Sequence, residues 1–217
     1  MGAPLRSLPF GRFALQLAPL LAEPIAERSM RSLHAHHEEL VRWAGVVSLV
    51  GPAFGSELFE RHYAESLAAL PLLPAGPGAL LDLGSGAGFP GLVIAAARPD
   101  LAVTLVEARE RKWAFLNAAA RRAELSCHCL RATVGAAHQP ELPGRVAIVT
   151  ARALRISPAM LTTLASSLLD DASLLLWTGE DAPDFMPDFR LVEAHRLPGS
   201  ERRWLRRYHR ETPRGPR

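Results

Sequence analysis

Residues 80–91 read LLDLGSGAGFPG and combine a short apolar strand with a turn that is dense in glycine. Gly84, Gly86 and Gly88 lack a Cβ atom, so the backbone there can turn sharply and its N–H groups can approach a ligand closely. Pro90 has a fixed φ and no N–H to donate, which suits the first turn of a helix. The stretch therefore predicts a strand, a ligand-binding loop and a helix in immediate succession.

Two classes of nucleotide cofactor use such a unit. Residues 86–91 match the G-x-G-x-x-G pattern of dinucleotide-binding proteins, with the acidic Glu107 about 20 positions further on. Asp82 favours the other class, because the form D-x-G-x-G-x-G resembles the fingerprint of S-adenosylmethionine (SAM) methyltransferases. In either class Glu107 can accept hydrogen bonds from two vicinal ribose hydroxyls. A structural turn without a ligand is the alternative.

The composition indicates a globular α/β domain with an extension. The chain has 217 residues, 48% of them hydrophobic, and a mean hydropathy of +0.06. It contains no uninterrupted apolar run long enough to span a membrane. The apolar run 13–21 is broken by Gln16 and Pro19 and lacks a convincing cleavage site. We expect a cytoplasmic monomer without a membrane partner.

Basic residues crowd the end of the chain, whose formal net charge is +3. Only Glu201 and Glu211 oppose the arginines there, which are Arg202, Arg203, Arg206, Arg207, Arg210, Arg214 and Arg217. Such a cluster is typical of a surface that binds a phosphate backbone. A solvated charged tail is the alternative.

Two groups of metal-ligating residue types lack the spacing of a metal site. Cys127 and Cys129 flank His128, which is short of a four-ligand zinc set, and their alternation predicts a core strand. Residues 34–39, HAHHEE, have no second cluster to accompany them, so we interpret them as a polar helix face. No bound metal is expected.

The order of the predicted elements indicates two parts, a helical extension over residues 1–75 and an α/β domain over residues 76–217. The extension contains an apolar stripe over 33–44 and a second helix over 56–70 with Ser56 as its N-cap. The α/β part predicts a Rossmann-like, mostly parallel, seven-stranded sheet. After the first strand, further strands are expected at 103–107, 126–130, 146–150, 173–177, 189–196 and 203–208. The last two form an antiparallel pair, and helices are expected at 110–122 and 158–169.

Six segments in the same order carry a family resemblance. Residues 82–91 are close to the motif D-L-G-S-G-A-G-F-P-G, in which the Phe-Pro pair is specific. The other segments are LVRW at 40–43, RH with ESL at 61–67, RKWAFL at 111–116, ARA at 151–153 and GSERR at 199–203. Together they resemble the bacterial small-subunit rRNA guanine-N7 methyltransferases, the RsmG or GidB family, over nearly the whole chain.

The resemblance implies a class I SAM-dependent methyltransferase fold and methyl transfer from SAM to N7 of a guanine in 16S rRNA. The partner would be 16S rRNA or the small ribosomal subunit. It implies cofactor contacts from Asp82, Gly84, Ser85, Gly86, Gly88, Phe89, Glu107, Ala132, Thr133 and Arg152. It implies substrate contacts from His62, Thr178, Arg202 and Arg203. No catalytic acid or base is assigned, since N7 carries no proton to remove, and Arg152 is the candidate for positioning. A structural salt bridge is the alternative for Arg152.

Four positions depart from the family pattern. Thr133 replaces a glutamate, Thr178 a lysine, Glu65 an aspartate and Arg203 a histidine. These departures leave two alternatives open, a divergent paralog that methylates another RNA or a small molecule, and a member that binds SAM or RNA without turnover. A nicotinamide oxidoreductase is the weakest alternative, because no substrate domain or hydride-transfer partner is visible.

Overall fold

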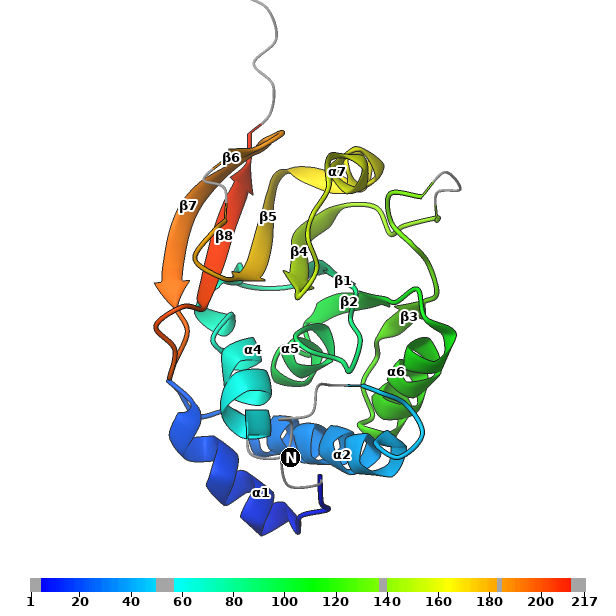
Figure 1. Ribbon diagram of the computed structural model, residues 1–217, viewed down its shortest axis with the longest axis vertical. Coiled ribbons are helices and arrows are strands. Elements are labelled where there is room, and N and C mark those ends of the chain that lie inside the picture. Colours follow the sequence, from blue (N-terminus) through cyan, green and yellow to red (C-terminus); the bar gives the residue numbers. More distant parts are fainter. Residues whose placement is uncertain (1–4, 50–56, 137–139, 183–184, 212–217) are drawn as a thin grey trace, which may run out of the picture.

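An eight-stranded sheet runs through the α/β part in the order β3-β2-β1-β4-β5-β8-β7-β6 (Figure 1). The computed structural model describes residues 5–49, 57–136, 140–182 and 185–211. The strands are β1 (Gly78–Leu83), β2 (Leu101–Val106), β3 (His128–Leu130), β4 (Val146–Arg152), β5 (Leu168–Thr178), β6 (Phe185–Met186), β7 (Phe189–Arg196) and β8 (Trp204–Arg210). The strands β1 to β5 are parallel, and β8 is antiparallel to both β5 and β7. All seven expected strands are present, and the two-residue β6 is added at the edge.

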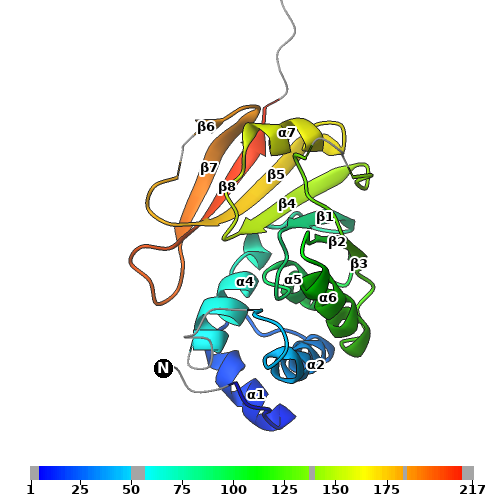
Figure 2. The ribbon, with the colours of Figure 1, turned by 45° about the vertical axis from the view of Figure 1, so that its right-hand side comes forward.

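The central strands are buried on both faces, because alternate side chains enter two separate cores. Leu80 and Ile148 lie in the core that includes α5 (Gly91–Ala97) and α6 (Glu110–Arg122). Leu81 and Val149 lie in the core that includes α7 (Pro158–Leu164), on the opposite face (Figure 2). This burial on both faces explains why their sequences are continuous apolar runs.

The helix expected at 158–169 is shorter than predicted. It ends at Leu164, and β5 begins at Leu168 instead of the expected residue 173. Leu168 pairs with Val146, and the Arg210 guanidinium donates to the carbonyls of Leu168 and Leu169. These partners are distant in sequence, so the apolar pattern alone could not place the boundary.

The N-terminal helices form a further layer beyond α5 and α6 (Figure 1). They are α1 (Phe10–Leu17), η1 (Ala18–Leu20), α2 (Glu27–Trp43), η2 (Leu58–Ala64), α4 (Glu65–Leu67) and η3 (Leu70–Leu72). The helix expected over 56–70 is thus divided into a π-helical segment, one α-turn and a 3-10 turn. Its expected N-cap, Ser56, lies outside the described residues. None of the described helices has the length and apolarity that crossing a lipid bilayer requires.

One hydrophobic core joins the N-terminal helices to the α/β part. Phe13, Leu33 and Tyr63 are fully buried in the same cluster as Leu92 and Phe115. The division at residues 75 and 76 stays a prediction.

The prediction of a polar helix face over 34–39 is wrong for three of its residues. His36, His37 and Glu39 on α2 are buried, with exposed fractions of 0%, 1% and 2%. Each has a hydrogen-bond partner inside the protein. Nε2 of His36 contacts the carbonyl of Ala87, Nε2 of His37 contacts the carbonyl of Arg6, and Glu39 accepts from Trp43 Nε1.

Within the described ranges, no three His, Cys, Asp or Glu side chains are grouped so as to hold a metal ion.

The glycine loop has the backbone geometry that its sequence predicts. Gly84, Gly86 and Gly88 have φ angles of 67°, 56° and 85°, in the left-handed region that favours glycine. Gly91, at the start of α5, is required for a different reason. A Cβ atom there would lie 2.5 Å from Leu105 Cδ2 and 2.6 Å from Asp82 Cβ.

We expect the substitution Gly91→Ala to lower the free energy of unfolding by about 3 kcal/mol, because the added methyl group overpacks the junction of β1, β2 and α5. Urea denaturation followed by circular dichroism measures this loss. Gly11→Ala is the matched control, since no atom lies within 4 Å of a Cβ at exposed Gly11 on α1. The control should be neutral or slightly stabilising. Equal stability of the two variants would contradict the packing argument.

Candidate active site

A cleft lies at the carboxyl ends of β1, β2 and β4, where the strand order reverses, the position at which open α/β sheets bind ligands. It encloses about 390 Å³. The described residues that line it are Leu49, His62, Gly84, Ser85, Gly86, Ala87, Phe89, Glu107, Arg109, Lys112, Arg152, Ala153 and Leu154. The glycine loop, the expected acid and the expected arginine are therefore brought together.

Asp82 lies beneath the loop and is absent from the cleft lining. Its side chain is fully buried, where Oδ2 accepts from the Gly91 N–H at 3.2 Å and Oδ1 accepts from the Thr150 hydroxyl at 2.6 Å. Burial raises its pKa to about 6, although the hydrogen bonds from Thr150, Ser85 and Gly91 oppose the shift. The structure thus places Asp82 as a support of the loop, whereas the fingerprint predicted a cofactor contact.

Glu107 stands at the end of β2 with its carboxylate fixed by two backbone amides. Oε2 accepts from the Gly86 N–H at 3.0 Å, and Oε1 accepts from the Arg109 N–H at 2.8 Å. Each oxygen retains a further lone pair for a ligand hydroxyl. Glu107 is also the one carboxylate among the described residues that line the cleft.

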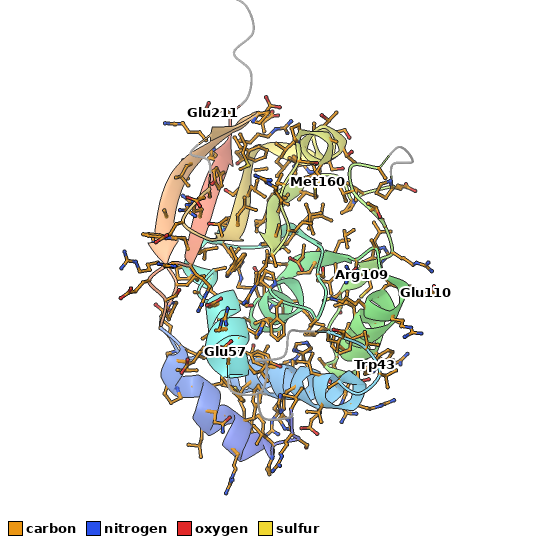
Figure 3. All side chains as sticks on the ribbon, viewed as in Figure 1. Trp43, Glu57, Arg109, Glu110, Met160 and Glu211 are labelled. Carbon is orange, nitrogen blue, oxygen red and sulfur yellow. The ribbon has the colours of Figure 1, made fainter. Side chains whose placement is uncertain are left out.

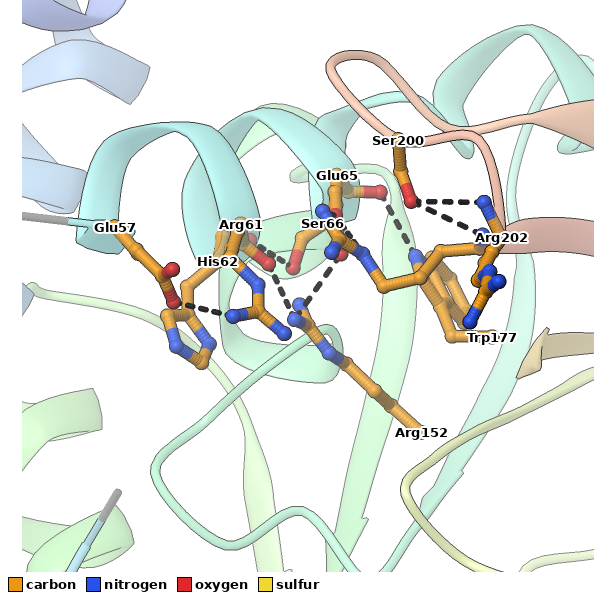
Figure 4. A network of polar contacts seen from close by, with 10 residues as sticks. Glu57, Arg61, His62, Glu65, Ser66, Arg152, Trp177, Ser200 and Arg202 are labelled. Atoms are coloured by element: carbon orange, nitrogen blue, oxygen red, sulfur yellow. Dashed lines mark hydrogen bonds and ion pairs between the residues drawn. The ribbon is translucent and has the colours of Figure 1, made fainter. Parts of the chain in front are cut away.

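Arg152, at the end of β4, belongs to an ion cluster centred on Glu65 (Figure 4). Glu65 is 1% exposed, and it accepts from Arg152 Nη2 at 3.1 Å and from Arg203 Nη2 at 2.6 Å. Arg152 Nη2 also donates to the carbonyl of Arg61, and the Trp177 indole donates to the carbonyl of Glu65. Arg152 therefore forms the salt bridge that was the alternative to a positioning role, and it also lines the cleft. Arg152 Nη1 is buried and has no hydrogen-bond partner among the described residues.

His62 lines the cleft between this cluster and the loop, with its ring centroid 5.0 Å from that of Phe89. Burial, followed by the positive charges of Arg152, Arg61 and Arg203, lowers its pKa to about 3. The imidazole is therefore neutral at physiological pH.

The other expected site residues lie elsewhere. Ala132 and Thr133 line a separate, open cavity of about 920 Å³ beside β3, although the Ala132 N–H donates to the Glu107 carbonyl. The Thr178 hydroxyl accepts from Arg206, and Arg203 donates to Glu65. The side chain of Arg202 is exposed and makes no hydrogen bond or ion pair with the described residues, while its N–H donates to Ser200 (Figure 4).

The arginines of β8 have partners within the protein, which the interpretation of the basic end as a phosphate-binding surface did not anticipate. Arg206 is 8% exposed and donates to the carbonyls of Gly179 and Glu180. Arg207 pairs with Glu193 at 2.5 Å. Arg210 donates to the carbonyls at the end of α7 and the start of β5. Arg214 and Arg217 lie outside the described residues.

The sequence interpretation missed several cleft residues. Lys112 lies in the first turn of α6, and Arg109, in extended conformation, immediately precedes that helix (Figure 3 labels Arg109). Both line the cleft. Ala153 has a φ of 54°, which costs about 1 kcal/mol for a residue other than glycine. It turns the chain so that Arg152 and Leu154 both line the cleft. The position of these residues directly after β2 and β4 was the signal that could have found them.

Comparisons with known proteins agree with this geometry. The family model described as GidB, rRNA small subunit methyltransferase G, matches residues 29–184. The ribosomal RNA small subunit methyltransferase G of Methylobacterium nodulans is 38% identical in an alignment 172 residues long that covers 75% of this chain and 77% of the relative. That of Acidiphilium cryptum is 37% identical over 152 residues, 69% of this chain and 68% of the relative.

Solved structures show the same fold at low sequence identity. A SAM-dependent methyltransferase from Aquifex aeolicus has a TM-score of 0.58 at 14% identity, covering 76% of this chain and 97% of that one. TrmN from Thermus thermophilus has a TM-score of 0.52 at 21% identity, covering 68% and 48%. The fold is thus the Rossmann-like methyltransferase fold, and the match over most of the sequence shows that the chain belongs to the GidB family, rRNA small subunit methyltransferase G.

Proposed function

We propose that this protein transfers a methyl group from SAM to N7 of a guanine in 16S rRNA. The observation that carries the proposal is a glycine loop facing one fixed carboxylate in a cleft at the strand-order reversal. Family membership supplies the substrate class, since its curated relatives are named ribosomal RNA small subunit methyltransferases.

The residues present fit SAM. Gly86 and Gly88 leave the loop without side chains, so that backbone groups can approach the ligand, and Glu107 offers two oriented oxygens to ribose hydroxyls. SAM supplies a methyl group activated by a sulfonium. The work of the protein is then to hold the cofactor and the target base in line and to exclude water.

The proton-transfer groups of the cleft favour an acceptor that has no proton to lose. His62 is a weak base, because its pKa is lowered to about 3, and the free lone pairs of Glu107 are assigned to the ribose hydroxyls of the cofactor. An exocyclic amine or a hydroxyl needs a general base, whereas N7 of guanine attacks through a free lone pair. N7 is therefore the acceptor that this cleft fits best.

Arg152 is suited to position the base. A guanidinium donates to O6 and N7 of guanine in known recognition, and donation to O6 alone would leave N7 available for methylation. The buried Nη1 lacks a partner among the described residues, so an acceptor from the substrate would satisfy it. Its partner Glu65 fixes the guanidinium before the base arrives.

The test uses small ribosomal subunits from a strain that lacks this gene, incubated with the purified protein and methyl-labelled SAM. Borohydride reduction followed by aniline cleavage maps N7-methylguanosine, and we expect one labelled site in 16S rRNA. Label in another RNA would identify the divergent paralog, and SAM binding without label would identify the member without turnover. Either result overturns the proposal.

We expect Glu107→Gln to weaken SAM binding 10- to 100-fold, since a charged hydrogen-bond partner contributes about 1.5–3 kcal/mol. Isothermal titration calorimetry measures the change. Glu110→Gln is the matched control, because it removes the same charge three residues away at an exposed side chain that pairs with Arg131. Equal affinity of the two variants would remove Glu107 from the ribose site.

We expect Arg152→Lys to lower kcat about 100-fold with little change in KM for SAM, because lysine keeps the charge but loses the planar fork. Arg207→Lys is the control, since Arg207 pairs with Glu193 on the outer strands. Its kcat should stay within about twofold of the wild type. A rise in KM for SAM in Arg152→Lys, with kcat unchanged, would assign Arg152 to cofactor binding instead.

A further inference from the structure

His36 on α2 connects the N-terminal helices to the glycine loop. The ring is fully buried, with Nε2 at 2.9 Å from the carbonyl oxygen of Ala87 and Nδ1 at 2.9 Å from the hydroxyl of Tyr63. Ala87 lies between Gly86 and Gly88 and lines the cleft. A helix of the extension thus contacts the middle of the loop through a residue that is not among the described residues lining the cleft.

The chemistry of the two partners determines which ring nitrogen of His36 carries the hydrogen. A carbonyl oxygen can only accept, so Nε2 of His36 must carry a hydrogen. Burial keeps the ring neutral, because it lowers the pKa of His36 to about 3, and Nδ1 therefore accepts from the Tyr63 hydroxyl. The direction of donation is Tyr63 to His36 to Ala87, and the Leu33 carbonyl, at 3.4 Å from the Tyr63 hydroxyl, is the more distant acceptor for the same hydrogen.

The side chains around His36 pack closely against the glycine loop. A Cβ atom on Gly88 would lie 3.2 Å from Nε2 of His36, so glycine allows the ring to approach the backbone. Phe89 lines the cleft and is enclosed by the rings of His36, Tyr63 and His62 at centroid distances of 5.1, 5.1 and 5.0 Å. His36 therefore contacts both the loop backbone and the aromatic side chain that follows it.

We propose that His36 is a positioning residue for the cofactor loop: its Nε2–H fixes the Ala87 carbonyl and so presets the loop for SAM. The inference rests on the proposed function in taking SAM as the ligand. It assigns the N-terminal helices a part in cofactor affinity, in addition to any contact with RNA.

Three substitutions of His36 distinguish the effect of losing the donated hydrogen bond from the effect of losing the volume of the ring. His36→Gln places an amide N–H near the position of Nε2 and can still donate to Ala87. His36→Asn reaches only the position of Nδ1, and His36→Leu cannot donate at all. Leu40→Ala, at another fully buried position on α2, is the control for lost stability.

We expect His36→Asn and His36→Leu to raise the Kd for SAM about tenfold or more, as loss of a buried hydrogen-bond partner implies. His36→Gln should stay within about threefold of the wild type, and Leu40→Ala should lower Tm while leaving the Kd within about twofold. Calorimetry well below Tm measures these values. Equal affinity of the Gln and Leu variants, or a loss of affinity in Leu40→Ala as large as in His36→Leu, would overturn the proposal.

Two measurements on the cofactor-free protein separate this inference from the proposed function. Amide hydrogen exchange over residues 84–88 should be about tenfold faster in His36→Leu than in the wild type or in His36→Gln. Nitrogen NMR of the wild type should show the hydrogen of His36 on Nε2. Unchanged exchange, or a hydrogen on Nδ1, would overturn the role of His36, whereas a wild type that binds no SAM would overturn the cofactor assignment alone.

Discussion

The buried carboxylate of Asp82 is the constraint on which the active-site geometry depends. It joins the end of β1 to β4 through the Thr150 hydroxyl and to the first residue of α5 through the Gly91 N–H. A buried carboxylate is costly unless donors surround it, so these donors must stay in place for the fold to be stable. The strand ends and the helix start beside the cleft are thus joined by a polar group that is not among the described lining residues.

The loop above Asp82 is held on two sides at consecutive residues. Glu107 accepts from the Gly86 N–H on the cleft side, and His36 contacts the Ala87 carbonyl on the side of the N-terminal helices. A loop fixed in this way loses little conformational entropy when a ligand binds. Such preorganisation suits a reaction in which alignment of two reactants does most of the catalytic work and no side chain transfers a proton.

The sequence predicted those features that depend on neighbours along the chain. The bounds of α6, the seven strands and the left-handed glycines follow from local periodicity and backbone sterics. The burial of His36 and the cluster around Glu65 did not follow, because their partners lie far away in sequence. Arg203 is separated from Glu65 by 138 residues and His36 from Ala87 by 51. Polar residues on α2 suggested a solvated face, since their buried acceptors could not be seen in the pattern.

Distant partners also explain why the number of arginines did not reveal their contacts within the protein. A guanidinium has five donors and can satisfy several carbonyl groups at once, as Arg210 does for the end of α7 and the start of β5. Arginines used in this way stabilise the antiparallel end of the sheet and have fewer N–H donors left for a phosphate. Arg109 and Lys112, by contrast, line the cleft without an ion pair to any described residue. Placement relative to the cleft, more than the number of arginines, therefore indicates where a negatively charged substrate would approach.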